Sequence, residues 1–177
     1  MDRNGNHSRC DGVDRCAGLG YICVRLEVWI KQIELLDMED RKALLVIDMQ
    51  KGSFTPKTPR YDAKGVVLRI NKLAQVFRKL NYPVIFIQHD GTGTGAFEKN
   101  LPNLEILEDL SVALSDIRID KYANDVFYKS QLHSKLKELK VGEVFITGCA
   151  TDFCVESTIQ SALTKDYNIT VVADGHT

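Results

Sequence analysis

The segment GCATDFCVEST, from Gly148 to Thr158, places two cysteines between an apolar run and a stretch with helical spacing. Cys154 could fill a core, form a redox pair with Cys149, or act as a nucleophile. Dithiol redox motifs usually have two residues between the cysteines, whereas four separate these two, which argues against a redox pair. If Cys154 begins a helix, the partial positive charge of the helix N-terminus would stabilise its thiolate. At this point Cys154 could be either a nucleophile or a core residue.

From Met38 onward, apolar runs of strand length alternate with stretches whose apolar residues recur every three or four positions. Such runs are typical of strands buried on both faces, and strands separated by helices predict a parallel sheet. We therefore expect an α/β fold: a three-layer, doubly wound, mostly parallel, Rossmann-like sheet with helices on both faces. The expected strands cover residues 43–47, 84–87, 117–119, 144–146 and 169–173, and the clearest helix covers residues 66–80.

Three side chains with catalytic potential follow the ends of expected strands, where open α/β sheets bind their ligands. Asp48 follows the first strand, Lys121 the third and Cys154 the fourth. Each alone has a simpler explanation, because strand-end aspartates often cap helices, lysines are usually solvated and cysteines often pack as small apolar residues. Together, an acid that accepts the thiol proton and an ammonium that stabilises the thiolate would allow attack on a carbonyl carbon.

Four segments resemble the isochorismatase-like cysteine hydrolases, a family that includes nicotinamidases, carbamoyl-amide hydrolases and isochorismatase. They are KALLVIDMQKGSF, PVIFIQHDG, IDKYANDVFYKSQL and GEVFITGCATDFCVESTIQSAL, in that order. The resemblance begins near residue 42 and runs to the C-terminus. It implies a catalytic triad of Asp48, Lys121 and Cys154.

The same resemblance implies the remaining parts of the machinery. A cis peptide between Cys149 and Ala150 would aim the backbone N–H groups of Ala150 and Cys154 at an oxyanion. Family members that cleave the vinyl ether of isochorismate lack the cysteine, so its presence favours another reaction. The implied function is hydrolysis of a small amide or carbamoyl C–N bond through a cysteine thioester.

Aromatic residues near the motifs are expected to line the substrate pocket, although each could equally pack in the core. The metal-binding branch of the family has an aspartate and several histidines after its second strand, whereas QHDGTGTGAF offers no such ligand set. We therefore expect no metal and no other cofactor. The expected pocket residues are Phe54, His89, Tyr122, Phe127 and Phe153.

The composition of the chain indicates which kinds of partner and which cellular compartment to expect. The 177 residues carry a formal net charge of -1, which gives no indication of nucleic acid or an anionic membrane as partner. No apolar run approaches the roughly 20 residues that span a bilayer, and the polar N-terminus is unlike a secretory signal. The five cysteines show no zinc-site spacing and indicate reduced thiols. We expect a cytoplasmic enzyme that acts on a small molecule.

The two ends of the chain depart from this regular pattern. Residues 1–37 show no clear period, so we expect a poorly ordered extension, or a misplaced start with Met38 as the native one. Residues 38–177 form the expected hydrolase domain. Their last segment, VVADGHT, lacks the further helix and possible sixth strand that family members usually have. An exposed sheet edge would follow, and with it a homo-oligomer. The alternative function is an inactive or truncated family member that acts as a binding or interaction protein.

Overall fold

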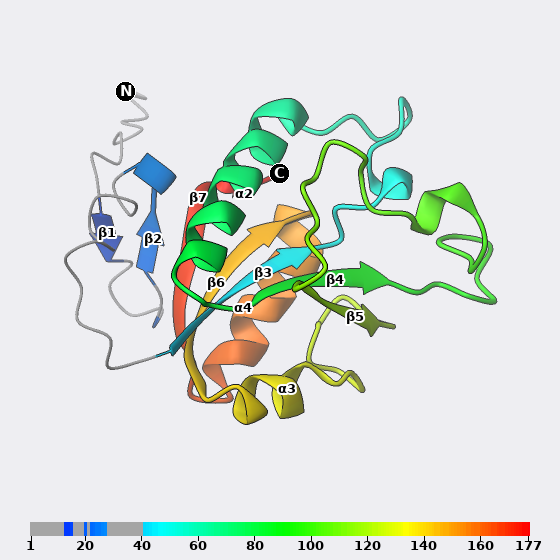
Figure 1. Cartoon of the computed structure of the whole chain (residues 1–177). Helices are drawn as coiled ribbons and strands as arrows, with labels where there is room; N and C mark the ends of the chain where they lie inside the picture. The colour runs from blue at the N-terminus through cyan, green and yellow to red at the C-terminus, as the bar shows by residue number, and fades with distance from the viewer. Residues whose placement is uncertain (1–12, 16–19, 21, 28–40) are drawn as a thin grey trace, which may run out of the picture.

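One seven-stranded sheet forms the centre of the molecule in the computed structural model shown in Figure 1, which describes residues 13–15, 20, 22–27 and 41–177. The strand order is β1-β2-β7-β6-β3-β4-β5, and every neighbouring pair is parallel except β1 and β2. The strands are β1 (Val13–Arg15), β2 (Ile22–Val24), β3 (Arg41–Ile47), β4 (Val84–His89), β5 (Ile117–Lys121), β6 (Val141–Gly148) and β7 (Asn168–His176).

Helices cover both faces of this sheet, as the alternation of buried residues requires (Figure 1). On β3, Leu44 and Val46 pack toward α2 (Ala63–Lys79), whereas Leu45 and its neighbours point to the opposite face. That opposite face is covered by α3 (Leu132–Glu138) and α4 (Glu156–Leu163). The predicted α/β fold with a mostly parallel sheet between two helical layers is therefore confirmed.

The helix α2 matches the apolar spacing that predicts it. Its buried residues are Val66, Val67, Ile70, Leu73, Ala74 and Phe77, which recur at three and four positions and form one stripe. The chain leaves the helix at Leu80 and continues through Asn81, whose φ is 57°, and Pro83 into β4. This connection from α2 into β4 allows β4 to pair in parallel with β3, so that the ends of the two strands lie side by side.

The order of the sheet reverses between β3 and β6, because the chain builds outward from β3 in one direction through β5 and then returns to form β6 and β7. A crevice at the carboxyl ends of the strands forms at such a switch point. Ile47 pairs with Gly148 there, and Gly148 has a φ of 120°. A Cβ on Gly148 would lie 2.1 Å from the Ile47 oxygen, so only glycine lets these two strand ends approach so closely.

Two short N-terminal strands, β1 and β2, belong to the sheet, but most of residues 1–37 lie outside the described residues, so the expected poorly ordered extension stays a prediction. β2 pairs in parallel with β7, with Ile22 opposite Thr170 and Val24 opposite Val172. The apolar side chains of Val24 and Leu26 are buried in the same core as α2, which explains why the segment adds to the sheet. The edge of β7 that the sequence analysis expects to be exposed is therefore paired within the chain. Met38 lies outside the described residues, so the proposed start there stays a prediction.

Candidate active site

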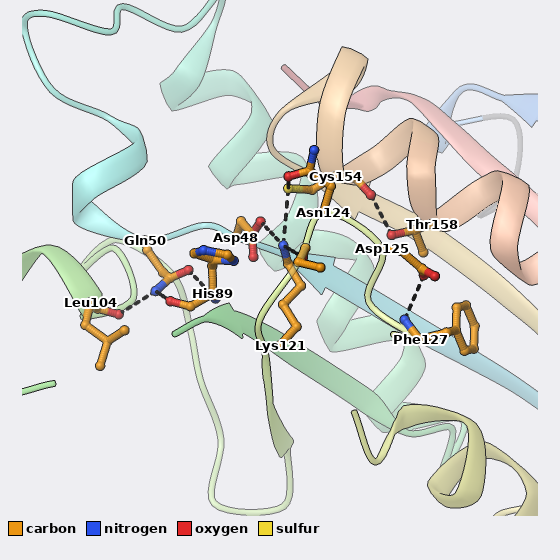
Figure 2. Close-up of polar contacts among 11 residues, drawn as sticks. Asp48, Gln50, His89, Leu104, Lys121, Asn124, Asp125, Phe127, Cys154 and Thr158 are labelled. Carbon is orange, nitrogen blue, oxygen red and sulfur yellow. Dashed lines mark hydrogen bonds and ion pairs between the residues drawn. The ribbon is translucent and has the colours of Figure 1, made fainter. Parts of the chain in front are cut away.

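The side chain of Lys121 contacts the other two predicted catalytic side chains, those of Asp48 and Cys154 (Figure 2). Its Nζ lies 2.8 Å from Asp48 Oδ2 and 3.2 Å from Cys154 Sγ, and it donates a third hydrogen bond to the Ala123 carbonyl at 2.8 Å. Asp48 follows β3, Lys121 ends β5, and Cys154 lies in the turn after β6. The sheet thus brings together residues that are 73 and 33 positions apart in the sequence along its carboxyl edge.

Lys121 is completely buried, which is unusual for a lysine. It shares a face of β5 with buried Ile119, because successive residues of a strand point to opposite sides. Desolvation of an ammonium is costly unless a charge and hydrogen bonds compensate it. Asp48, Cys154 and the Ala123 carbonyl supply those three contacts, so the site rather than the surrounding core determines where this lysine points.

Asp48 occupies a left-handed backbone position, with a φ of 50°, directly after β3. Its backbone N–H donates to the Ile87 carbonyl at 3.0 Å, which keeps the turn attached to β4. Burial raises the pKa of the Asp48 carboxyl, and the charge of Lys121 only partly opposes this effect. Its Oδ1 is buried and has no hydrogen-bond partner among the described residues, so one acceptor of this carboxylate is unused.

Cys154 lies in a π-helical turn, Thr151–Val155, that leads into α4. Burial raises the pKa of its thiol to about 12, the negative charge of Asp48 adds to this rise, and Lys121 opposes it. The resting cysteine is therefore a thiol. Burial and the carboxylate of Asp48 together outweigh the charge of Lys121, which favours the thiolate.

The turn before Cys154 has the shape that the resemblance implies. The bond between Cys149 and Ala150 is cis, and the Cys149 N–H donates to the Ile47 carbonyl at 2.9 Å. The Ala150 carbonyl accepts from the N–H groups of Phe153 and Val155. No backbone acceptor for the Ala150 N–H occurs in the described part of the chain, which leaves this donor available to a ligand.

A cavity of about 340 Å³ opens onto Asp48 and Cys154. His89 and Phe153 line it, as the sequence analysis expects, but three other expected residues do not. Phe127 is buried in the core beneath α3 and stacks on Tyr167, Phe54 packs against the α2 side of the core, and Tyr122 is more than half exposed outside the cavity. The lining residues are Asp48, Gly52, Ser53, Thr58, Arg60, His89, Phe97, Asn124, Cys149, Ala150, Phe153 and Cys154.

The surroundings of His89 favour its neutral form. Burial lowers the pKa of its imidazole, and the positive charge of Lys121 lowers it further. The ring packs edge-on against Phe97, with 5.6 Å between the centroids. Its backbone is held by Gln50, whose side-chain amide accepts from the His89 N–H at 2.7 Å and donates to the His89 carbonyl at 3.1 Å (Figure 2).

The sequence analysis missed several residues of the site, among them Gln50, Asn124, Arg60 and Phe97. Gln50 is part of the quoted segment VIDMQKG, and Asn124 follows Lys121 closely, so motif position could have indicated both. Asn124 places its Oδ1 3.7 Å from Cys154 Sγ (Figure 2). Arg60 and Phe97 come from connecting loops with no periodic pattern, and nothing in the local sequence indicates that they reach the cavity.

The described residues contain no group of three or more His, Cys, Asp and Glu side chains arranged to hold a metal ion. None of the described helices combines the length and apolar character that crossing a bilayer requires.

Comparison with known proteins places this chain in a family. The Isochorismatase domain model matches residues 42–177. The Ureidoacrylate amidohydrolase RutB of Caulobacter vibrioides is 37% identical over 169 residues, covering 75% of each chain, and the isochorismatase family protein YddQ of Bacillus subtilis is 31% identical over 135 residues, also covering 75% of each. A crystal structure of an isochorismatase family protein superimposes with a TM-score of 0.70 at 32% identity, covering 73% of this chain and 76% of the other.

Proposed function

This chain belongs to the isochorismatase family, and we propose that it hydrolyses a small amide or carbamoyl C–N bond through a thioester on Cys154. The observation that carries the proposal is the position of one buried ammonium, Lys121, in contact with both a thiol and a carboxylate. The relative RutB, named as a ureidoacrylate amidohydrolase, supports amide chemistry for a site of this kind.

In the proposed resting state Lys121 and Asp48 form an ion pair, and Cys154 is a thiol. Because burial raises the pKa of Asp48, this carboxylate is a stronger base than one in water, and its unpartnered Oδ1 can accept a proton. The thiol proton moves to Asp48 as the sulfur attacks. The negative charge that this leaves on Cys154 Sγ is stabilised by the Lys121 side chain, whose Nζ lies 3.2 Å away. At neutral pH only a very small fraction of Cys154 is therefore thiolate, and the transfer of its proton to Asp48 makes the sulfur nucleophilic.

The sulfur then bonds to the carbonyl carbon and the C=O π pair moves to oxygen. The N–H groups of Ala150 and Cys154 are proposed to stabilise that oxyanion. As the oxyanion collapses, the C–N bond breaks, and the departing nitrogen takes the proton from Asp48. The products of this half-reaction are ammonia or an amine, and a Cys154 thioester.

Hydrolysis of the thioester uses the same groups in the same roles. Asp48, again a carboxylate, removes a proton from a water molecule as the water oxygen bonds to the thioester carbon. The C–S bond breaks and the sulfur recovers the proton from Asp48. One amide and one water are consumed, one acid and one amine are released, and the resting thiol is restored.

A panel of small primary amides and N-carbamoyl compounds tests the proposal through ammonia release. We expect turnover with at least one class, loss of turnover in Cys154→Ala, and a covalent acyl adduct on the Cys154 peptide after an acid quench. Cys149→Ser is the matched control, because it alters the neighbouring buried thiol and leaves the triad in place. Binding of panel members without turnover or adduct would instead support the alternative, an inactive family member that acts as a binding protein.

A cytoplasmic location and a homo-oligomer also belong to the proposal, but the oligomer no longer rests on an exposed sheet edge, because β2 pairs with β7. Light scattering tests the oligomer directly, and a monomer at micromolar concentration would contradict it.

A further inference from the structure

The cavity beside the triad holds one cation that the chemistry of the triad does not use. The side chain of Arg60 lines it, on the loop between the short 3-10 helix Lys51–Ser53 and α2. The Asp48 carboxylate is already paired with Lys121, and within the described ranges no carboxylate forms an ion pair with Arg60. Lys121 therefore balances the charge of Asp48, and Arg60 is left as a cation of the cavity wall with no ion-pair partner among the described residues.

One hydrogen bond sets the orientation of Arg60. Its Nε donates to the Ser53 carbonyl at 3.1 Å, and the side chain is partly buried. For the two terminal nitrogens, the described part of the chain provides no acceptor. A guanidinium held in this way presents the planar pair of donors that matches a carboxylate in bidentate geometry.

The charge of Arg60 reaches the catalytic turn. Burial raises the pKa of the Cys149 thiol to about 11, and Arg60 is the leading group that opposes this rise. Cys149 and Cys154 line the same cavity. A ligand whose amide lies at Cys154 can therefore reach Arg60 within a space of about 340 Å³, which suits a small molecule.

The geometry points to a specificity residue: Arg60 binds a carboxylate on the substrate, which makes the preferred substrates small amides that carry an acid group. This inference rests on the proposed function and deepens it, because it names the class of amide that the cavity accepts. Apolar parts of the ligand would lie between the rings of Phe97 and Phe153, which also line the cavity.

Protection of Cys154 from iodoacetamide tests the binding step without requiring turnover. The probes are malonamate, succinamate and glutaramate, each paired with its neutral diamide of the same length. We expect at least one anionic probe to protect at a concentration roughly tenfold lower than its diamide, the effect of one charge-assisted hydrogen-bonding contact. The advantage should vanish in Arg60→Met and return in part in Arg60→Lys.

Lys57→Met is the matched control, because Lys57 is an exposed cation on the same loop that does not line the cavity. A purely structural role for Arg60 would weaken anionic and neutral probes equally, and that result would overturn the inference. Equal protection by acid and diamide in the unmodified chain would also overturn it, and this comparison needs no variant to fold. Ammonia release is measured in parallel: Arg60-dependent protection without ammonia release supports the acid-binding site and counts against the proposed hydrolysis.

Discussion

Asp48→Asn should make Cys154 more reactive toward an alkylating agent while it abolishes hydrolysis. The carboxamide has nearly the same shape but neither carries a charge nor accepts the thiol proton. Asp48 and Cys154 contact the same ammonium, so they lie at most about 6 Å apart, where a unit charge contributes roughly 3 kcal/mol at an effective dielectric of about 20. Loss of that charge lowers the pKa of Cys154, about 12 in the unmodified chain, by about two units.

The change in alkylation rate follows from two opposing effects. A fall of about two pKa units raises the thiolate fraction at pH 7.5 by about a hundredfold. The less basic thiolate is also a weaker nucleophile, by about tenfold if reactivity follows basicity with a slope near 0.5. We therefore expect Cys154 to react with iodoacetamide roughly tenfold faster in Asp48→Asn.

The assay is the rate of iodoacetamide labelling of the Cys154 peptide by mass spectrometry, from pH 6 to 10. Hydrolysis by the same preparation should fall by at least about a hundredfold, the usual effect of removing a general base. Asp152→Asn is the control, because it removes an exposed carboxylate from the same turn. Slower or unchanged labelling in Asp48→Asn would refute the charge coupling, and undiminished hydrolysis would refute the role of Asp48 as the base.

Three further results are expected. Lys121→Met should slow labelling of Cys154, abolish hydrolysis and lower the free energy of unfolding by about 3–5 kcal/mol, because it leaves the buried Asp48 carboxylate unpaired. The double variant with Asp48→Asn should recover much of that stability in urea titrations but none of the activity. Cys149→Ser should retain kcat within about threefold, because the reaction we propose forms no bond to Cys149; a hundredfold loss would contradict this. Burial lowers the pKa of His89 and of His176, so the unfolded chain binds more protons below about pH 6.5, and the free energy of unfolding should fall from pH 7.5 to 5. Replacing His89 and His176 by glutamine should reduce that dependence, with His133, whose pKa burial also lowers, contributing the remainder, and an unchanged slope would argue against it.

The sequence was most informative where a pattern repeats. Apolar runs located β3, β4 and β6, and the three- and four-residue spacing of α2 predicted a helix that begins only three residues earlier than expected. Strand ends then indicated Asp48 and Lys121, because the carboxyl ends of parallel strands share one edge.

Burial and loop shape could not be read from the sequence. Lys121 lies in a polar segment, DKYAND, and its complete burial depends on Asp48 and Cys154 arriving from two other strands. The sequence also could not predict that the pKa of the Cys154 thiol is raised to about 12. The start of the helix can be recognised in the sequence, but the burial that raises the pKa cannot. The positions of Phe127 and Arg60 could not be predicted either. Phe127 packs in the core, and Arg60, on a loop, lines the cavity.

The pairing of β2 with β7 has a consequence for how the chain is made. β2 leaves the ribosome early, but its partner residues, Thr170–Val172, are added on the order of ten seconds later at the usual rate of synthesis. Until then this short strand has no native neighbour in β7, and loop closure across almost the whole chain must precede their pairing. β2 is therefore among the first strands to be synthesised and among the last to find its place.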